Sequence, residues 1–484
     1  MAKKTNNKPL KAGIWYTICN FIVKGLAFLT MPIFTRIMST DDIGMFSNIT
    51  SWFSILAIIT TFEIYSSVSI ARFDYKDDLD SYISSSLILG TLITSFFYFI
   101  VLIFNDFFQK LFMVDFITLN LMFIYLLVYP SIQMYQMKHR IKYSYIPTIV
   151  ISLLNALLST AISVILVLIM KNKLQGRVFG YFIPLILIAC VVYILLLKDG
   201  KSFSKKYWKY ALEISFPLIW HLLAGYVLSS SDRIMITRLI STDANALYSV
   251  SYTISMVASI LWTSMNNAWS PWAYEQMNKE EFDSLKSNSK PYTIFFLIVV
   301  FTFMLITPEL LLIMGGKYYL QAKYVMPPVM VGYIFQFVYS LYVNIEFYHK
   351  KQKNIAFGTI IAAIINVILN FIFIPKFGYI AAAYTTLIGY ISLFCIHFLF
   401  VKKLNCTWWY DSKFFGILLL VSLISIPFFN FLYSYNIIRY VLFGIIGIVF
   451  GIFILKNYKE LLKLLKKKDF KGIVNLFLRK RGVA

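Results

Sequence analysis

The sequence predicts an all-α, polytopic membrane protein with about fourteen transmembrane helices and no soluble domain of useful size. Of its 484 residues, 59% are hydrophobic and only 14% are charged, whereas soluble domains contain about 45–50% apolar and about 25% charged residues. Apolar runs long enough to cross about 30 Å of hydrocarbon recur along the whole chain. The polar segments between them are too short to fold as separate domains.

We expect about fourteen spans, each close to the length that a membrane-crossing helix needs. Their residues are 12–36, 45–71, 82–105, 114–137, 144–170, 177–198, 208–235, 245–272, 291–314, 322–349, 354–375, 379–401, 413–433 and 437–456. Some of the connections are only weakly polar, so roughly twelve or thirteen spans would also fit the pattern.

The formal net charge of +23 would suggest a nucleic acid partner in a soluble protein. Here the basic residues alternate with apolar runs instead of forming one patch, so we expect no nucleic acid partner. With a cytoplasmic N-terminus, Lys and Arg are roughly three times as frequent in the inside segments as in the outside loops. This bias predicts that the N- and C-termini are both cytoplasmic.

Cysteine usage excludes a disulfide framework or a zinc site, because Cys19, Cys190, Cys395 and Cys406 form no CxxC pair. Enzymatic motifs are equally weak. Asp78-Leu79-Asp80 is a lone DxD in a short loop, and the chain has no nucleotide-phosphate loop, HExxH or GxSxG. We therefore expect a transporter without a cofactor, driven by an ion gradient, a partner protein or the substrate gradient.

An internal repeat divides the chain. Residues 33–47 read IFTRIMSTDDIGMFS and residues 235–249 read MITRLISTDANALYS. Thr35, Arg36, Ser39, Thr40, Asp41 and Ser47 match Thr237, Arg238, Ser241, Thr242, Asp243 and Ser249. An even number of predicted spans separates the copies, so both have the same orientation. Two parallel six-helix lobes with a site between them are a transporter architecture.

This repeat predicts four regions. They are an N-lobe at 1–200, a C-lobe at 201–404, two appended helices at 405–457 and a tail at 458–484. In the tail, apolar residues recur at helical spacing among many Lys and Arg residues. Such a basic amphipathic helix is expected to lie on the anionic inner leaflet, with an acidic or calmodulin-like partner as the alternative.

Ionisable residues within the hydrocarbon cost about 2.5–3.5 kcal/mol each and are therefore functional candidates. Lys24 lies near the middle of the first predicted span, where it could bind a phosphate group from a water-filled cavity. The alternative is an internal ion pair with Glu63, which lies at a similar depth on the second span. The two interpretations are compatible.

Four arginines near span ends extend the candidate substrate site: Arg36, Arg72, Arg233 and Arg238. Ordinary snorkelling toward the interface is the alternative for each of them.

Acidic residues and a histidine are candidates for ion coupling. Asp232 follows a run of serines that suggests a wet helix face, and Glu213 and His221 lie on the same span. For His221, a structural interhelical hydrogen bond is the alternative. Glu346 and His349, at the inner end of the tenth span, are expected to be interfacial.

Several stretches resemble the Wzx-type oligosaccharide flippases of the multidrug/oligosaccharidyl-lipid/polysaccharide exporter superfamily. They are the opening KAGIWYTICNFIVKGLAFLTMPIFTRIMSTDDIGMFS, SSSDRIMITRLIST at 229–242, AWSPWAYEQM at 268–277 and NVILNFIFIPKFGYIAAAYTTLIGY at 366–390. The resemblance runs over the whole chain except the tail.

The resemblance implies a V-shaped, two-lobed fold of fourteen helices in a bacterial cytoplasmic membrane. It implies that the protein flips an undecaprenyl-diphosphate-linked oligosaccharide for capsule, exopolysaccharide or O-antigen synthesis, with a polysaccharide polymerase and glycosyltransferases as possible partners. The family's cationic cavity fits Lys24 by its depth. Relatives that flip the peptidoglycan precursor also use a basic residue in the eighth helix, but residues 245–272 contain no Lys or Arg.

Two other functions remain open. An ion-coupled multidrug antiporter of the same fold would use acidic cavity residues, for which Glu63, Asp232 and Glu213 are the candidates. A membrane-embedded polysaccharide polymerase or other glycan enzyme is disfavoured, because such enzymes generally carry a large external loop.

Overall fold

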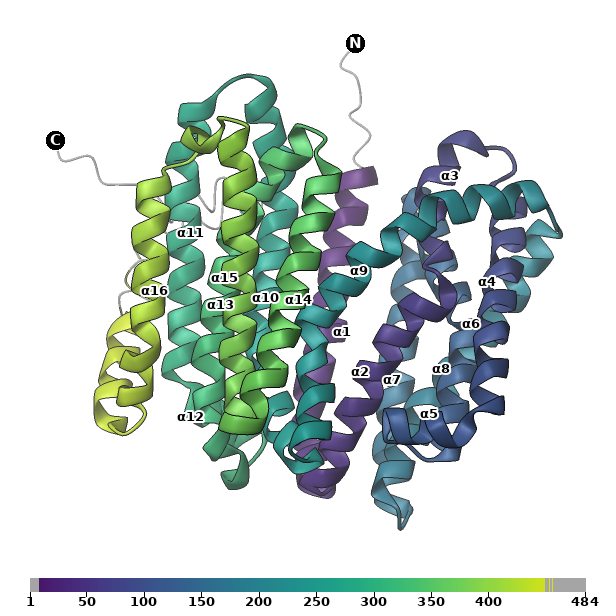
Figure 1. Ribbon diagram of the computed structural model, residues 1–484, viewed down its shortest axis with the longest axis horizontal. Coiled ribbons are helices and arrows are strands. Elements are labelled where there is room, and N and C mark those ends of the chain that lie inside the picture. The colour runs from purple at the N-terminus through teal and green to yellow at the C-terminus, as the bar shows by residue number, and fades with distance from the viewer. Residues whose placement is uncertain (1–7, 449–451, 453–454, 456–484) are drawn as a thin grey trace. The chain divides into compact units, whose positions relative to one another are not determined.

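The computed structural model describes residues 8–448, 452 and 455, and in this part of the chain the regular structure is entirely helical (Figure 1). The first half comprises α1 (Lys8–Ile37), α2 (Thr40–Thr61), η1 (Ile64–Ser67), α3 (Val68–Asp74), α4 (Leu79–Ile103), α5 (Asn105–Phe112), α6 (Phe116–Ile141), α7 (Tyr145–Ile169), α8 (Lys173–Gly200) and α9 (Lys205–Leu239). The second comprises α10 (Thr242–Asn278), α11 (Phe282–Leu305), α12 (Thr307–Met314), η2 (Lys317–Val325), α13 (Met326–Tyr348), α14 (Gln352–Phe377), α15 (Tyr379–Lys403), η3 (Thr407–Trp409) and α16 (Ser412–Leu432).

The prediction of a polytopic helical membrane protein is confirmed. Among the described residues, 13 helices are long and apolar enough to cross a membrane. The predicted fourteenth span begins as the helix Asn436–Ile448, and the rest of it lies outside the described residues, as does the tail at 458–484. The short helices α5 and α12 were not expected: α5 lies in the loop predicted between residues 105 and 114, and α12 lies within the predicted span 291–314.

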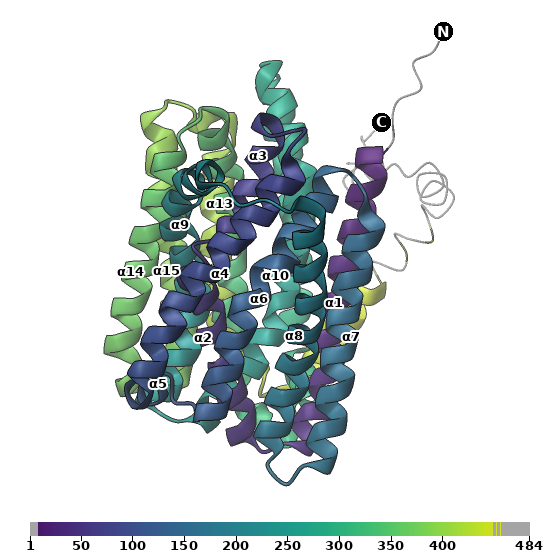
Figure 2. The same ribbon diagram turned by 90° about the vertical axis from the view of Figure 1, so that its right-hand side faces the viewer.

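The helices cluster into two units, which differ from the predicted lobes in their bounds. Unit 1 comprises residues 1–250, 314–316 and 359–382, and unit 2 comprises 251–313, 317–358 and 383–484. Within unit 1, α4, α6, α7 and α8 pack side by side (Figure 2). Glycines permit the closest approach there: a Cβ atom at Gly180 would meet the backbone of Ser163 on α7. The lobe division at residues 200 and 404 stays a prediction.

The two copies of the sequence repeat touch each other inside unit 1, at the turns between α1 and α2 and between α9 and α10 (Figure 1). The hydroxyl oxygens of Ser47 and Ser249, equivalent positions in the two copies, lie 2.6 Å apart. The amide of Asn245 donates to the carbonyl of Gly44 over 2.8 Å. Contact between equivalent residues is what a two-fold relation between the copies requires near its axis.

We call this contact the repeat junction. It consists of Asp41, Gly44 and Ser47 with Thr242, Asn245 and Ser249. Gly44 is needed for the close approach, because a Cβ atom there would collide with the backbone carbonyl of Thr242.

The second predicted span, 45–71, is not one continuous helix. α2 ends at Thr61, and Phe62 and Glu63 both adopt the left-handed conformation with φ values of 51° and 52°. This conformation is uncommon for residues other than glycine. The chain then continues through η1 into α3. In a membrane protein, such a break is tolerated only where protein or a wet cavity satisfies the freed backbone groups.

Unit 2 is organised around α13, whose residues are almost all buried. Aromatic rings form much of its core: Phe337 stacks on Phe296 of α11 at 4.5 Å between ring centroids, and Tyr342 packs against Phe394 of α15 and Phe415 of α16. Close aromatic packing of this kind fixes helices in register. These contacts fix α11, α15 and α16 against α13.

Candidate functional site

The predicted basic residues occupy separate places on unit 1. Lys24 lies on α1 with its side chain exposed. Arg36, at the end of α1, donates to the carbonyl of Pro32 over 2.6 Å, and Arg238, at the end of α9, donates to the carbonyl of Leu111 over 3.2 Å. Both arginines therefore lie at helix ends, beside the repeat junction.

Arg72 and Arg233 are half-buried. Arg72 lies on the short helix α3, where its guanidinium covers the ring of Phe73 at 4.3 Å from the ring centroid. Arg233 follows Asp232 on α9. α3 and the α9 segment that contains Arg233 lie toward opposite ends of α2, so the arginines do not form one compact anion site.

The predicted ion pair between Lys24 and Glu63 does not form. Glu63 is 6% exposed and accepts a hydrogen bond from the Ser66 hydroxyl over 3.1 Å, whereas the Lys24 side chain is exposed. The helix break explains the difference, because Glu63 leaves the α-helical path on which the depth comparison with Lys24 depended.

Glu213 and His221 also differ from the prediction of a coupled pair. The Glu213 side chain is 63% exposed and lies 3.9 Å from Lys209 one helical turn earlier. An exposed pair of this kind contributes little to stability. His221 is half-buried on the same helix, two turns away from Glu213, which is too far for the two side chains to share a proton directly.

Asp232 is the most completely buried of the predicted site residues, with 1% of its surface exposed. One carboxylate oxygen accepts a hydrogen bond from the Tyr248 hydroxyl over 2.5 Å, and the other accepts one from the Asn370 amide over 2.6 Å. The same amide lies 3.2 Å from the side-chain oxygen of Asn366. Carboxylate and amide oxygens bind hard cations, and a carboxylate can also bind a proton.

The sequence indicates part of this centre. Asp232 stands out as a charge within an apolar run, but its partners are neutral residues on distant helices. Asn366 and Asn370 are one helical turn apart on α14 and are both fully buried. Two buried amides at this spacing in an apolar span are the signal that sequence reasoning missed.

A buried carboxylate–imidazole pair in unit 2 was also missed. Glu346 was expected to be interfacial, yet Glu346 and His397 are both completely buried, and their nearest oxygen and nitrogen atoms lie 2.6 Å apart. The pair joins α13 to α15. Gly358 on α14 makes room for the imidazole, because a Cβ atom there would come within 2.5 Å of its Nε2 atom.

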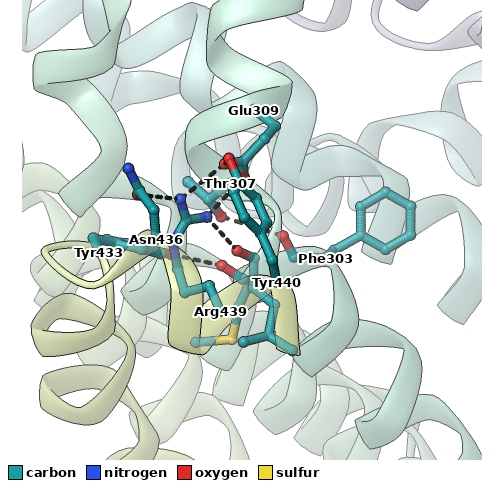
Figure 3. Close-up of polar contacts among 9 residues, drawn as sticks. Phe303, Thr307, Glu309, Tyr433, Asn436, Arg439 and Tyr440 are labelled. Carbon is teal, nitrogen blue, oxygen red and sulfur yellow. Dashed lines mark hydrogen bonds and ion pairs between the residues drawn. The ribbon is translucent and has the colours of Figure 1, made fainter. Parts of the chain in front are cut away.

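Unit 2 contains a second missed group, shown in Figure 3. The guanidinium of Arg439, on the helix Asn436–Ile448, donates to both carboxylate oxygens of Glu309 over 2.7 and 2.8 Å. It also donates to the carbonyl of Leu305 and the side chain of Asn436, each over 2.8 Å. Tyr440 adds a hydrogen bond to Glu309 over 2.9 Å. We call this group the arginine junction.

The arginine junction has the properties of a group that holds helices together. Arg439 is 2% exposed, and a bidentate pair has the strongest geometry available to a carboxylate. Burial raises the pKa of the Glu309 carboxyl, but the hydrogen bonds from Arg439 and Tyr440 outweigh burial and lower this pKa below its usual value. The junction ties α12 and the end of α11 to the last described helix.

The DxD segment also has a structural explanation. Lys138 on α6 lies 2.8 Å from Asp80 and 2.8 Å from Asp199, so Asp80 belongs to an ion-pair group that joins α4, α6 and α8. Within the described residues, no three His, Cys, Asp or Glu side chains gather into a group that would hold a metal ion.

Comparisons with known proteins agree on the class of protein. The profile of a family described as polysaccharide biosynthesis protein matches residues 10–277. An uncharacterized membrane protein of Haemophilus influenzae is 25% identical over 230 residues, which cover 46% of this chain and 56% of the relative. The Lsg locus putative protein 1 of the same organism is 26% identical over 201 residues, covering 41% and 50%. The chain thus spans about half the length of the curated relatives it matches.

Solved structures share the fold at low sequence identity. The lipid II flippase MurJ, in an inward closed conformation, has a TM-score of 0.64 and 16% identity, with 93% of this chain and 100% of that chain covered. An inward-facing multidrug resistance MATE family transporter has a TM-score of 0.59 and 15% identity, with 81% and 97% covered. A transporter from Pyrococcus furiosus has a TM-score of 0.54 and 13% identity, with 83% and 98% covered. At these identities the likeness shows the fold alone.

Proposed function

We propose, from the premise that this chain belongs to the polysaccharide biosynthesis protein family, that it flips an undecaprenyl-diphosphate-linked oligosaccharide repeat unit across the cytoplasmic membrane. The flipped unit would enter capsule, exopolysaccharide or O-antigen synthesis. The fold is that of flippases and transporters. The finer assignment also draws on the resemblance to Wzx-type flippases.

The repeat junction is the observation that carries the proposal. Equivalent segments of the two repeat copies meet through Ser47 and Ser249 at 2.6 Å, with two further hydrogen bonds, from Asn245 to the carbonyl of Gly44 and from Thr242 to the carboxylate of Asp41. Each such hydrogen bond contributes only about 1 kcal/mol net, so the contact is weak enough to break and re-form. Alternating access needs a closure of this kind on one side of the membrane.

The orientation proposed from loop charge puts both termini in the cytoplasm and the repeat junction at the outer side. We propose that the repeat junction, when formed, blocks the path at the outer side. Substrate would enter from the cytoplasmic side, where the glycosyltransferases supply it, and would leave when the repeat junction opens. A polysaccharide polymerase would then act on the released unit.

We propose that the basic residues Lys24 and Arg72 bind the diphosphate. Arg36, Arg233 and Arg238 then contact the lipid-linked oligosaccharide near the outer side. Their separation supports a path with several weak sites rather than one tight site. A transported anion must leave each site that it enters, so weak successive sites suit transport.

Asp232 is proposed as the coupling site. It is buried on α9, ten residues before Thr242 of the repeat junction, and its hydrogen-bond donors come from α10 and α14. A cation or a proton that binds there would change the contacts between helices that lead into the junction. Site occupancy would thereby be coupled to opening.

An ion-coupled multidrug antiporter is the second candidate. The buried acids Glu63 and Asp232 favour it, because antiporters of this fold need carboxylates that exchange an ion for the drug. Ethidium efflux by the wild type that Asp232→Asn abolishes would support this candidate, and absence of efflux would exclude it.

Reconstitution tests the flippase directly. Purified protein in vesicles is supplied with a labelled lipid-linked repeat unit in one leaflet, and the label that reaches the other leaflet is measured over time. Transfer above that of empty vesicles supports the proposal. No transfer, together with normal surface polysaccharide in a strain that lacks the gene, would contradict it.

A further inference from the structure

A cluster of tyrosines surrounds the helix break in unit 1. Tyr65 follows the break, Tyr129 lies on α6, Tyr181 on α8 and Tyr226 on α9. The rings of Tyr65 and Tyr129 lie 6.0 Å apart, and Tyr226 is within electrostatic range of Tyr129, Tyr181 and Glu63. Four separate elements therefore bring phenol groups to one place.

The four tyrosines differ in exposure. Tyr65, Tyr129 and Tyr181 are half-buried and Tyr226 is 43% exposed. A second layer of rings lies behind them and is buried: Phe53 stacks on Tyr125 at 5.1 Å and meets Tyr129 at 5.7 Å. The buried layer holds the accessible rings in place, as a binding site requires.

Glu63 gives the cluster a buried acceptor. Its carboxylate receives hydrogen bonds from Ser66 and Tyr65, whereas an ionised carboxylate has about four acceptor positions. Among the described residues, Glu63 forms no ion pair. The left-handed conformation of Glu63 is a strained backbone state of the kind that structures retain at binding sites.

Arg177 gives the cluster a cation at its other end. It lies one helical turn before Tyr181 on α8, and its guanidinium is held between the rings of Phe34 and Phe46, at 3.5 and 4.5 Å from their centroids. Among the described residues, this half-buried guanidinium forms no ion pair. When a guanidinium stacks on aromatic rings, its five N–H donors lie in its own plane, where a ligand can accept hydrogen bonds from them.

The spacing suits an extended ligand. Phe46 lies on α2, and Glu63 follows shortly after its last residue, Thr61; the part of α2 from Phe46 to Thr61 corresponds to roughly 22 Å of helix rise. Tyr181 and Tyr129 occupy the interval between the cation and the carboxylate.

We propose that Glu63, Tyr65, Tyr129, Tyr181, Tyr226 and Arg177 form a glycan-binding track within unit 1. Sugar rings have apolar C–H faces, which pack on aromatic rings, and hydroxyl edges, which donate to a carboxylate and accept from a phenol or a guanidinium. Glu63 binds neutral sugar hydroxyls, and Arg177 binds an oxygen-rich or acidic sugar substituent. The inference rests on the proposed function and adds where the glycan lies.

Equilibrium binding to the full-length protein in lipid nanodiscs tests the track with two probes. One is the undecaprenyl-diphosphate-linked repeat unit extracted from the source strain, and the other is undecaprenyl diphosphate without sugar. The measured quantity is the ratio of the two dissociation constants. This ratio isolates the contribution of the glycan from that of the lipid and the diphosphate.

We expect the preference for the glycosylated probe to fall about tenfold in Glu63→Gln and in Arg177→Gln, and about fivefold in Tyr129→Phe, which loses one hydroxyl. Binding of the bare lipid stays unchanged. Glu275→Gln, which changes an exposed carboxylate in unit 2, and Tyr98→Phe, which changes a tyrosine outside the track, keep the wild-type ratio.

The possible outcomes separate the track from the function. A ratio within twofold of the wild type in Glu63→Gln and Tyr129→Phe overturns the track. Equal weakening of both probes in Arg177→Gln overturns the assignment of Arg177 to the glycan and makes it a diphosphate ligand. Wild-type protein that binds neither probe contradicts the proposed function itself. If Glu63→Gln does not fold, Tyr226→Phe gives the same test at an exposed position.

Discussion

Two helix junctions in this protein are built from different chemistry. The repeat junction in unit 1 is held by single hydrogen bonds between hydroxyl, amide and carbonyl groups, such as that between Ser47 and Ser249. The arginine junction in unit 2 is a bidentate ion pair between Arg439 and Glu309 with three further hydrogen bonds. The first kind of contact can exchange at little cost, and the second is permanent once buried.

A similar contrast holds between one acidic residue of each unit. Glu63 in unit 1 accepts from hydroxyl groups and retains acceptor capacity, whereas both oxygens of Glu309 bind Arg439. A carboxylate that is fully paired contributes to the scaffold, and one that is partly satisfied can bind a ligand. The difference suggests that transport chemistry concentrates in unit 1 and that unit 2 supplies rigidity.

The largest effect on stability is expected from Glu309→Gln. The change leaves the buried Arg439 without its counter-charge, which costs about 3 kcal/mol, the lower end of the range for a broken buried pair because Glu309 is 30% exposed. The melting temperature of the purified protein should fall by several degrees. If adding Arg439→Met restores most of the lost melting temperature, the pairing is confirmed. An unchanged melting temperature in Glu309→Gln would contradict the claim that the arginine junction stabilises unit 2.

Asp232→Asn tests the same contrast in unit 1, where we expect an effect on transport and little effect on stability. Asparagine keeps the size; its oxygen can accept from Asn370 and its NH2 group can donate to the Tyr248 hydroxyl, so the melting temperature should change little. Transport should fall at least tenfold and lose its dependence on an imposed ion gradient, because the binding charge is gone. Flux measured with and without the gradient checks this, and gradient-dependent flux in the variant would remove Asp232 from coupling.

Lys24→Ala is expected to lower flipping several-fold without affecting membrane insertion, because we propose that the exposed Lys24 is one of several weak sites for the diphosphate. Lys24→Arg should retain most of the activity, since it preserves the charge. Flux of the labelled repeat unit, normalised to inserted protein, measures the effect. Equal flux in Lys24→Ala and the wild type would exclude Lys24 from the path.

The smallest effect concerns acid stability. The pKa of Glu309 is lowered in the folded protein, so its contribution is present above the unfolded value of about 4.3 and is lost as pH falls through the lower folded value. The expected loss is below about 1 kcal/mol, after allowance for its partial exposure. The difference in melting temperature between the wild type and Glu309→Gln should become smaller below pH 4 without vanishing, and a difference that does not change with pH would contradict the pairing.

The fold class and most spans were predictable from apolar length alone, because lipid imposes that length on each helix. The break at Glu63 was not, since Phe62 and Glu63 include neither glycine nor proline, and tertiary contacts impose the left-handed conformation. The position of Asp232 within an apolar span identified it as a candidate. Its hydrogen-bond partners could not be identified in this way, because they come from α10 and α14.

The arginine junction was hidden for a related reason. Glu309 and Arg439 each lie near a predicted span end, where a charged side chain is ordinarily explained by snorkelling. They are 130 residues apart, and nothing in either local sequence indicates the other. Pairing between distant helix ends depends on packing that a single sequence does not reveal.

The central claim is that the repeat junction must open during transport. Ser47→Cys with Ser249→Cys, in a background whose four native cysteines are replaced by serine, tests it most directly. The two hydroxyl oxygens are 2.6 Å apart, close to the roughly 2.05 Å of a disulfide bond. We expect oxidation to abolish flipping and reduction to restore it, while each single-cysteine variant is unaffected. Undiminished flipping by the fully cross-linked protein would contradict the account.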